Sequence, residues 1–221
     1  MSQPQPAGIG KGRIEALADG VFAIAMTLLV LDLKTPAPGP GETADDLPRK
    51  LGEMWPRFLT YVVSFLILGV LWVGHHAQLH YVRRSDRPFL WMNLAFLMVV
   101  SAMPFSTALL GAYREQPVAV AVYCGNLVVA GLVLFGQLHY AAGPGRLFDA
   151  DMDPALIRAG SRRLLMGPAL YSLAAGLAFV STTASLVVCA LTPLLYLLPG
   201  RVDRLWSSGE RPPEGDSPTK G

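Results

Sequence analysis

Residues 13–32 read RIEALADGVFAIAMTLLVLD, and the fold class depends on this stretch. As an α-helix it rises about 1.5 Å per residue, which is enough to cross a hydrocarbon core about 30 Å thick. Most of the stretch is apolar, yet Asp19 lies about a turn and a half inside it. A carboxylate in hydrocarbon is costly and must face protein or water, so Asp19 marks a functional position.

One face of this predicted helix carries Ile24, Thr27, Leu28 and Leu31, at spacings i, i+3, i+4 and i+7. Branched aliphatic side chains with one hydroxyl suit either a packing seam or the wall of a narrow pore. The periodicity alone favours the seam, because apolar stripes more often pack in a core than line a pore.

The composition excludes several classes of protein. Of 221 residues, 52% are hydrophobic and only 15% are charged, which is typical of a chain with several membrane spans. The net charge of +2 is too small to indicate a nucleic-acid partner. Cys124 and Cys189 lie in apolar runs, so we expect buried small side chains rather than a disulfide or a metal site.

Apolar runs predict an all-α integral membrane protein. A leader at 1–13 precedes a transmembrane domain at 14–199, and a tail occupies 200–221. Residues 181–185 are predicted to form a tight turn and residues 142–163 a polar connection. Six spans are predicted, at 14–33, 58–79, 88–110, 118–141, 164–180 and 184–198.

The last two runs fit either two crossings or a re-entrant hairpin, and the charge distribution favours two crossings. With six spans, 13 of the 18 Lys and Arg residues lie on the side of both termini. Positive charge marks the cytoplasmic side. We therefore expect a protein of the cell membrane with both termini in the cytoplasm.

Several polar residues of different spans share one depth in this topology. Asp19, His75, His76 and Asn93 each lie about one turn or more from the cytoplasmic end of a span, and Trp72 lies a turn deeper. Such groups can satisfy one another's hydrogen bonds and join helices. The other interpretations are a proton relay or a metal site, since His76 and His80 stand at i and i+4.

Other motifs indicate little chemistry. Asp149, Asp151 and Asp153 alternate before Pro154, but the rest of a calcium loop is missing, so a helix N-cap at Asp153 explains them better. The sequence contains no phosphate-binding loop, no zinc-protease motif and no nucleophile elbow, and we predict that the protein is not an enzyme. It also lacks the TVGYG selectivity loop of ordinary potassium channels.

Three motifs together resemble prokaryotic relatives of the endosomal/lysosomal potassium channel called transmembrane protein 175. They are Arg13-x-x-x-Leu17-Ala18-Asp19-Gly20, Trp72-Val-Gly-His75-His76 and Trp91-Met-Asn93-Leu94. The resemblance covers the first three predicted spans, and the last three match in number and hydrophobic character. Where the family has Phe-Ser before the aspartate, this chain has Leu17-Ala18, which removes a hydroxyl.

The resemblance implies a homotetrameric, potassium-preferring cation channel in the lipid bilayer, whose pore is lined by the first helix of each subunit. By position after the aspartate, Ile24, Leu28 and Leu31 correspond to hydrophobic constrictions, with Thr27 on a neighbouring line. The family's structural polar network corresponds to Arg13, Asp19, Trp72, His75, His76 and Asn93. No cofactor, metal or small-molecule substrate is implied, only permeant K⁺.

Asp32 is the predicted residue of the outer pore mouth, where it either concentrates cations or simply ends the helix beside Lys34. The alternative function is a proton- or ion-coupled transporter that uses Asp19 with His75 and His76 as a relay. A third possibility is a membrane enzyme that holds a metal on the histidines.

Overall fold

The structure, a computed structural model, describes residues 11–37, 39, 43–143, 147–148 and 153–197. Every regular element in these residues is a helix, as the sequence predicts. The elements are α1 (Lys11–Leu28), η1 (Leu29–Asp32), η2 (Ala44–Asp46), α2 (Leu47–Glu53), α3 (Trp55–Tyr81), α4 (Arg87–Ser101), α5 (Met103–Ala112), α6 (Pro117–Ala141), α7 (Pro154–Leu177) and α8 (Thr182–Leu197).

The first four predicted spans are matched by helices long and apolar enough to cross a membrane. These segments are Lys11–Asp32, Trp55–Tyr81, Arg87–Ala112 and Pro117–Ala141. Because α1 begins at Lys11, the last three residues of the predicted leader are helical. Residues 1–10 of the leader and 198–221, which contain the whole predicted tail, lie outside the described residues.

The third span is not one continuous helix. Where a single run over 88–110 was predicted, α4 ends at Ser101, Ala102 forms a cap, and α5 begins at Met103. The break coincides with Pro104, which lies in the first turn of α5. Proline has no amide hydrogen and its ring clashes with the preceding turn, so it is tolerated at a helix start but not in a helix interior.

The prediction of a polar connection over 142–163 is wrong in its second half, because α7 begins at Pro154. The carboxylate of Asp153 accepts a hydrogen bond of 2.8 Å from the backbone N–H of Ala155, so the predicted N-cap is confirmed. Asp149 and Asp151 lie outside the described residues.

The final helices form a hairpin whose turn comes earlier than predicted, because α7 ends at Leu177 and α8 begins at Thr182. The 16 residues of α8 make an apolar helix shorter than the four spans. It is about 24 Å long at about 1.5 Å per residue.

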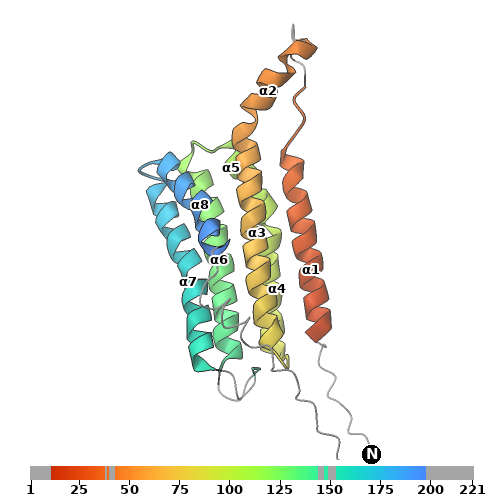
Figure 1. Cartoon of the computed structure of the whole chain (residues 1–221), viewed down its shortest axis with the longest axis vertical. Coiled ribbons are helices and arrows are strands. Elements are labelled where there is room, and N and C mark those ends of the chain that lie inside the picture. The colour runs from red at the N-terminus through yellow and green to blue at the C-terminus, as the bar shows by residue number, and fades with distance from the viewer. Residues whose placement is uncertain (1–10, 38, 40–42, 144–146, 149–152, 198–221) are drawn as a thin grey trace, which may run out of the picture.

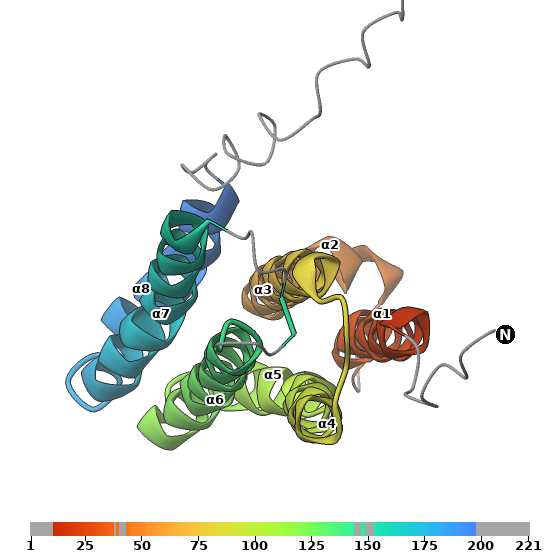
Figure 2. The ribbon, with the colours of Figure 1, turned by 90° about the horizontal axis from the view of Figure 1, so that it is seen from below.

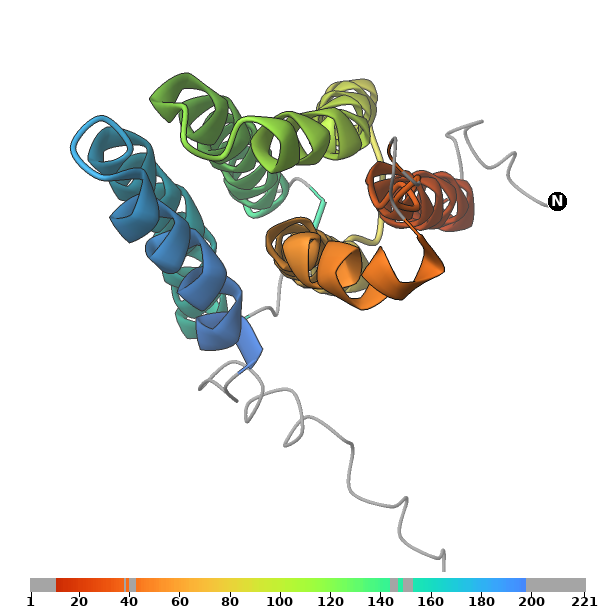
Figure 3. The ribbon, with the colours of Figure 1, turned by 90° about the horizontal axis from the view of Figure 1, so that it is seen from above.

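The long helices run roughly along one axis (Figure 1). Seen from either end, α1 lies at one edge and the α7–α8 hairpin at the opposite edge, with α3, α4, α5 and α6 between them (Figures 2 and 3). The main core contains Phe22, Leu68, Phe96, Tyr123 and Leu134, which are all buried.

The cysteines also lie in this core. Cys124 of α6 and Cys189 of α8 are buried free thiols whose sulfur atoms are 3.2 Å apart.

Candidate functional site

The helix α1 has one face turned to the protein and one turned away from it. Its buried residues are Ile14, Ala18, Phe22 and Ala25, and they are continued by Leu29 of η1. This face packs against α3, α4 and α5. The spacing of three or four residues along the buried face is what a helix requires to hold one side against its neighbours.

The predicted pore residues lie on the outward face. Ile24 is 61% exposed, Leu28 43% and Leu31 67%, and Thr27 is exposed as well. These side chains therefore do not form a packing seam within the chain, because they do not pack into its core. The reason is that α1 lies at the edge of the bundle, with only one side covered (Figure 2).

The outward row is longer than the sequence motif indicated. At about 3.6 residues per turn, Arg13, Leu17 and Gly20 continue the line of Ile24 toward the N-terminus. All three are exposed. We call Arg13, Leu17, Gly20, Ile24, Leu28 and Leu31 the α1 stripe. In the sequence, Leu17 stands out only as a departure from the family pattern, although its spacing of seven residues from Ile24 places it on this row.

Asp19 lies on the flank of the stripe and binds α3. The indole Nε1–H of Trp72 donates a hydrogen bond of 2.8 Å to the Asp19 carboxylate. The Trp72 ring also stacks on His76, with ring centres 5.6 Å apart and planes 24° apart. A carboxylate acceptor makes this hydrogen bond stronger than one between neutral groups. It therefore ties the N-terminal half of α1 to α3.

A second polar pair lies in the core behind the first. His75 of α3 and Asn93 of α4 are both buried, and His75 Nε2 lies 2.8 Å from Asn93 Oδ1. The imidazole also stacks on Phe96 at 5.0 Å and contacts Phe22 at 6.3 Å. This pair therefore joins α3 to α4 directly beneath the buried face of α1.

The six residues predicted to form one network thus divide into separate groups. Asp19, Trp72 and His76 meet at the α1–α3 surface, and His75 meets Asn93 inside. Among the described residues, no hydrogen bond joins Asp19 to either histidine, and none joins Arg13 to Asp19. Arg13 lies on the α1 stripe and belongs to neither of these two groups.

Asp32 lies at the far end of the stripe and is half-buried. Its carboxylate contacts Gly111 at the end of α5 so closely that a Cβ added there would lie 2.8 Å from Oδ2. Within the described residues the Asp32 carboxylate forms no ion pair with Lys34. The two residues are joined by a backbone hydrogen bond, which the N–H of Lys34 donates to the carbonyl of Asp32. The contact with Gly111 could not be read from the sequence, because 78 residues lie between the two positions.

The predicted histidine positions can be compared with a metal site in the described part of the chain. There, no group of three or more His, Cys, Asp and Glu side chains gathers where it could hold a metal ion. His76 and His80 are both exposed on α3, and the backbone carbonyl of His80 accepts a hydrogen bond from Lys11.

Comparison with known proteins extends the similarity beyond the three motifs. The family described as endosomal/lysosomal potassium channel TMEM175 matches residues 13–104. A potassium channel from Streptomyces collinus is 44% identical over 190 residues, which cover 84% of this chain and 90% of the relative. The match therefore includes the later helices too.

Two further relatives are informative. The crystal structure of a lysosomal potassium-selective channel TMEM175 homolog from Chamaesiphon minutus superposes with a TM-score of 0.76 at 36% identity, covering 85% of this chain and 96% of that one. The human endosomal/lysosomal proton channel TMEM175 is 32% identical over 186 residues, covering 79% of this chain but only 36% of the human protein. The coverage and sequence identity of these matches show that this chain belongs to the TMEM175 family of membrane channels, which are not enzymes.

Proposed function

We propose that the protein is a potassium-preferring cation channel that assembles as a homotetramer, with four α1 helices around a common pore. The observation that carries the proposal is the exposed α1 stripe. Ile24, Leu28 and Leu31 are large apolar side chains that a single chain leaves uncovered. The opposite face of the same helix is anchored on α3, α4 and α5, so the stripe has a fixed direction.

In the tetramer, each residue of the stripe is repeated around the axis as a ring. Rings of branched aliphatic side chains exclude water from a narrow pore and gate it by dewetting. In the open state, an ion must lose part of its hydration shell to pass such a ring. K⁺ holds water less tightly than Na⁺, so the rings favour K⁺ without carbonyl ligands. This mechanism agrees with the missing TVGYG loop.

The polar pairs position the pore helix in this proposal. The Trp72–Asp19 hydrogen bond fixes the rotation of α1 relative to α3. The His75–Asn93 pair holds α3 and α4 together behind it. Interhelical hydrogen bonds in membranes are each worth about 0.6–2 kcal/mol. That is enough to bias the direction in which Ile24 points. The two polar pairs themselves take no part in conduction.

The alternative is a proton- or ion-coupled transporter with an Asp–His relay. The relatives from bacteria are named potassium channels, whereas those from animals are named proton channels. A relay requires the carboxylate to exchange protons with an imidazole. Asp19 instead accepts from the indole of Trp72, and His75 pairs with Asn93, which favours a structural role for both groups.

For the membrane arrangement we propose six crossings in the cell membrane, with both termini cytoplasmic. The N-terminus of α1 lies at the same end of the bundle as the α3–α4 connection and the start of α7 (Figure 1). The arginines of these segments, Arg83, Arg84, Arg87 and Arg158, make this end basic, which is typical of the cytoplasmic side. Asp32 then lies at the outer mouth of the pore.

The decisive experiment is flux through purified protein in liposomes that carry a K⁺ gradient. We expect Ile24→Asn and Leu28→Asn to raise K⁺ flux and reduce the preference for K⁺ over Na⁺, because an amide hydrates the constriction. The matched control is Leu132→Asn on α6, since Leu132 is 47% exposed and Leu28 43%. The control is expected to conduct like the wild type.

An Asp19→Asn variant separates the channel from the transporter. If the protein is a channel, Asp19→Asn keeps passive K⁺ flux in the tetramers that assemble, because Asp19 only positions α1. If Asp19→Asn abolishes transport in an intact oligomer, and Ile24→Asn leaves flux unchanged, the pore assignment must be abandoned.

A further inference from the structure

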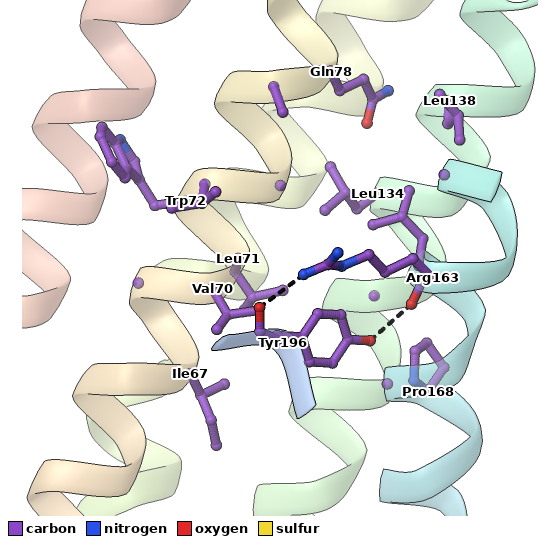
Figure 4. A pocket seen from close by; sticks show the side chains of 18 of the residues that line it. Ile67, Val70, Leu71, Trp72, Gln78, Leu134, Leu138, Arg163, Pro168 and Tyr196 are labelled. Carbon is purple, nitrogen blue, oxygen red and sulfur yellow. Dashed lines mark hydrogen bonds between the residues drawn. The ribbon is translucent and has the colours of Figure 1, made fainter. Parts of the chain in front are cut away.

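A crevice of about 700 Å³ lies between α3 and the α7–α8 hairpin, and α6, which packs directly on α7, lines it as well. Its walls are mostly aliphatic and include Val70, Leu71, Leu134 and Leu138 (Figure 4). This is the size of a typical ligand pocket, which is mostly apolar with a few polar groups that fix the ligand's orientation. The α1 stripe lies on another part of the bundle, so the crevice is separate from the proposed pore, although Trp72 belongs to the lining of the crevice and also binds Asp19.

Among the described residues that line the crevice, Arg163 of α7 is the charged one. Its guanidinium reaches across the crevice toward α8, where it donates a hydrogen bond of 2.7 Å to the backbone carbonyl of Tyr196 (Figure 4). The Tyr196 hydroxyl in turn donates to the Arg163 carbonyl at 2.8 Å. An arginine at membrane depth is costly and marks a functional position by default.

The depth of Arg163 follows from its neighbours. The next residue, Leu164, lies near Gly74 of α3 and so does Leu134 of α6. Gly74 stands seven residues before the end of α3 at Tyr81, a distance of about 10 Å along the helix axis. Arg163 therefore lies inside the membrane-spanning part of the bundle, on the cytoplasmic side in the proposed topology.

The walls favour an anion at this position. Neither α3, α6, α7 nor α8 contains an Asp or Glu, whereas α7 carries Arg158 and Arg162 in addition to Arg163. A guanidinium has five N–H donors and matches a phosphate with two parallel hydrogen bonds. Basic pockets between transmembrane helices on the cytoplasmic side are a recognised setting for anionic lipid headgroups.

We infer that the crevice between α3, α6 and the α7–α8 hairpin binds one anionic phospholipid, with its phosphate at Arg163 and an acyl chain along the aliphatic walls. The crevice lies beside segments of membrane-spanning length, where lipid is the abundant amphiphile. The inference does not depend on ion conduction.

The test uses the full-length purified protein and native mass spectrometry with added phosphatidylglycerol or phosphatidylcholine of the same acyl chains. The wild type is expected to bind phosphatidylglycerol several-fold more tightly than phosphatidylcholine. Both lipids offer the phosphate, but the quaternary ammonium of choline is repelled by the guanidinium of Arg163. Arg163→Gln removes this preference, and Arg163→Lys restores part of it because the charge remains. Arg158→Gln, an exposed arginine on the same helix, keeps the preference.

A second pair of variants tests the acyl chain. Gly69 lines the crevice, and a Cβ there would meet no atom within 4 Å, so the side chain of Gly69→Leu has room to start and takes up space in the crevice. It reduces the binding of both lipids several-fold. Gly125→Leu is the control, because its Cβ position is equally open but outside the crevice.

Two results overturn the inference. One is equal binding of the two lipids by the wild type, which would mean that the crevice does not distinguish lipids by their net charge. The other is equal loss in Arg158→Gln and Arg163→Gln, which would mean diffuse attraction to the basic end of the bundle. Thermal melting of each variant shows whether it is folded. If Arg163→Gln does not fold, Gly69→Leu still tests whether lipid occupies the crevice.

Discussion

The contact between α6 and α7 depends on a missing side chain at Gly131. A Cβ built at this position would lie 2.6 Å from Cγ and 2.9 Å from Cδ of Pro168. Pro168 stands inside α7, and its rigid ring fills the space above the glycine. The substitution Gly131→Ala therefore forces α6 and α7 apart.

The expected magnitude follows from these distances. Carbon atoms in good contact are about 3.5–4.0 Å apart, so α7 must shift by about 1 Å near Pro168. Overpacking of this kind costs about 1–3 kcal/mol. Alanine also favours a helix over glycine by about 1 kcal/mol, and this gain must be separated from the clash.

The variant Gly125→Ala provides the separation. Gly125 lies on the same helix, and a Cβ there meets no atom within 4 Å. Both variants gain the same helix propensity, so Gly131→Ala is expected to be less stable than Gly125→Ala by about 1–3 kcal/mol. The assay is unfolding of purified protein in mixed micelles of mild detergent and dodecyl sulfate. Equal stability of the two variants would refute the close packing of α6 on Pro168.

Three further substitutions test polar side chains of the bundle, two at interhelical hydrogen bonds and one at a buried amide of α6. Trp72→Phe removes the hydrogen bond to Asp19 and is expected to lower the melting temperature of the oligomer, with a cost of about 0.6–2 kcal/mol; an unchanged melting temperature would contradict a role in fixing α1. Asn93→Leu leaves the buried His75 without its partner and should cost about 1–3 kcal/mol in the unfolding assay, whereas a stability equal to wild type would show that the pair contributes nothing. Gln137 is buried and its amide has no hydrogen-bond partner in the described structure, so Gln137→Met is expected to raise stability by about 1–3 kcal/mol, and a fall in stability would show that the amide is satisfied.

Much of the fold could be predicted from local sequence alone. Runs of apolar residues located the first four spans, because only a helix satisfies all its backbone groups in lipid. The Asp153–Pro154 pair correctly located the start of α7, since a side-chain acceptor followed by proline suits the first turn of a helix. The break at Ala102 was missed, although Pro104 was visible as a signal.

The partners of the polar residues were harder to predict. The shared depth of Asp19, Trp72, His75 and Asn93 was evident from their positions in the spans. Depth along the membrane does not fix rotation about each helix axis, and rotation decides which side chains meet. Hence the structure pairs Asp19 with Trp72 and His75 with Asn93, where the sequence allowed one common cluster.

The sequence by itself determined a helical membrane protein, the apolar periodicity of its first helix and the depth of its polar groups. Only the tertiary structure decided that Ile24, Leu28 and Leu31 face outward and that Arg163 projects into a crevice. The physical reason is that a helix in a bilayer can be apolar on every side. Hydrophobicity then no longer distinguishes the core from the lipid or from a pore, and packing against the neighbouring helices fixes the direction of each face.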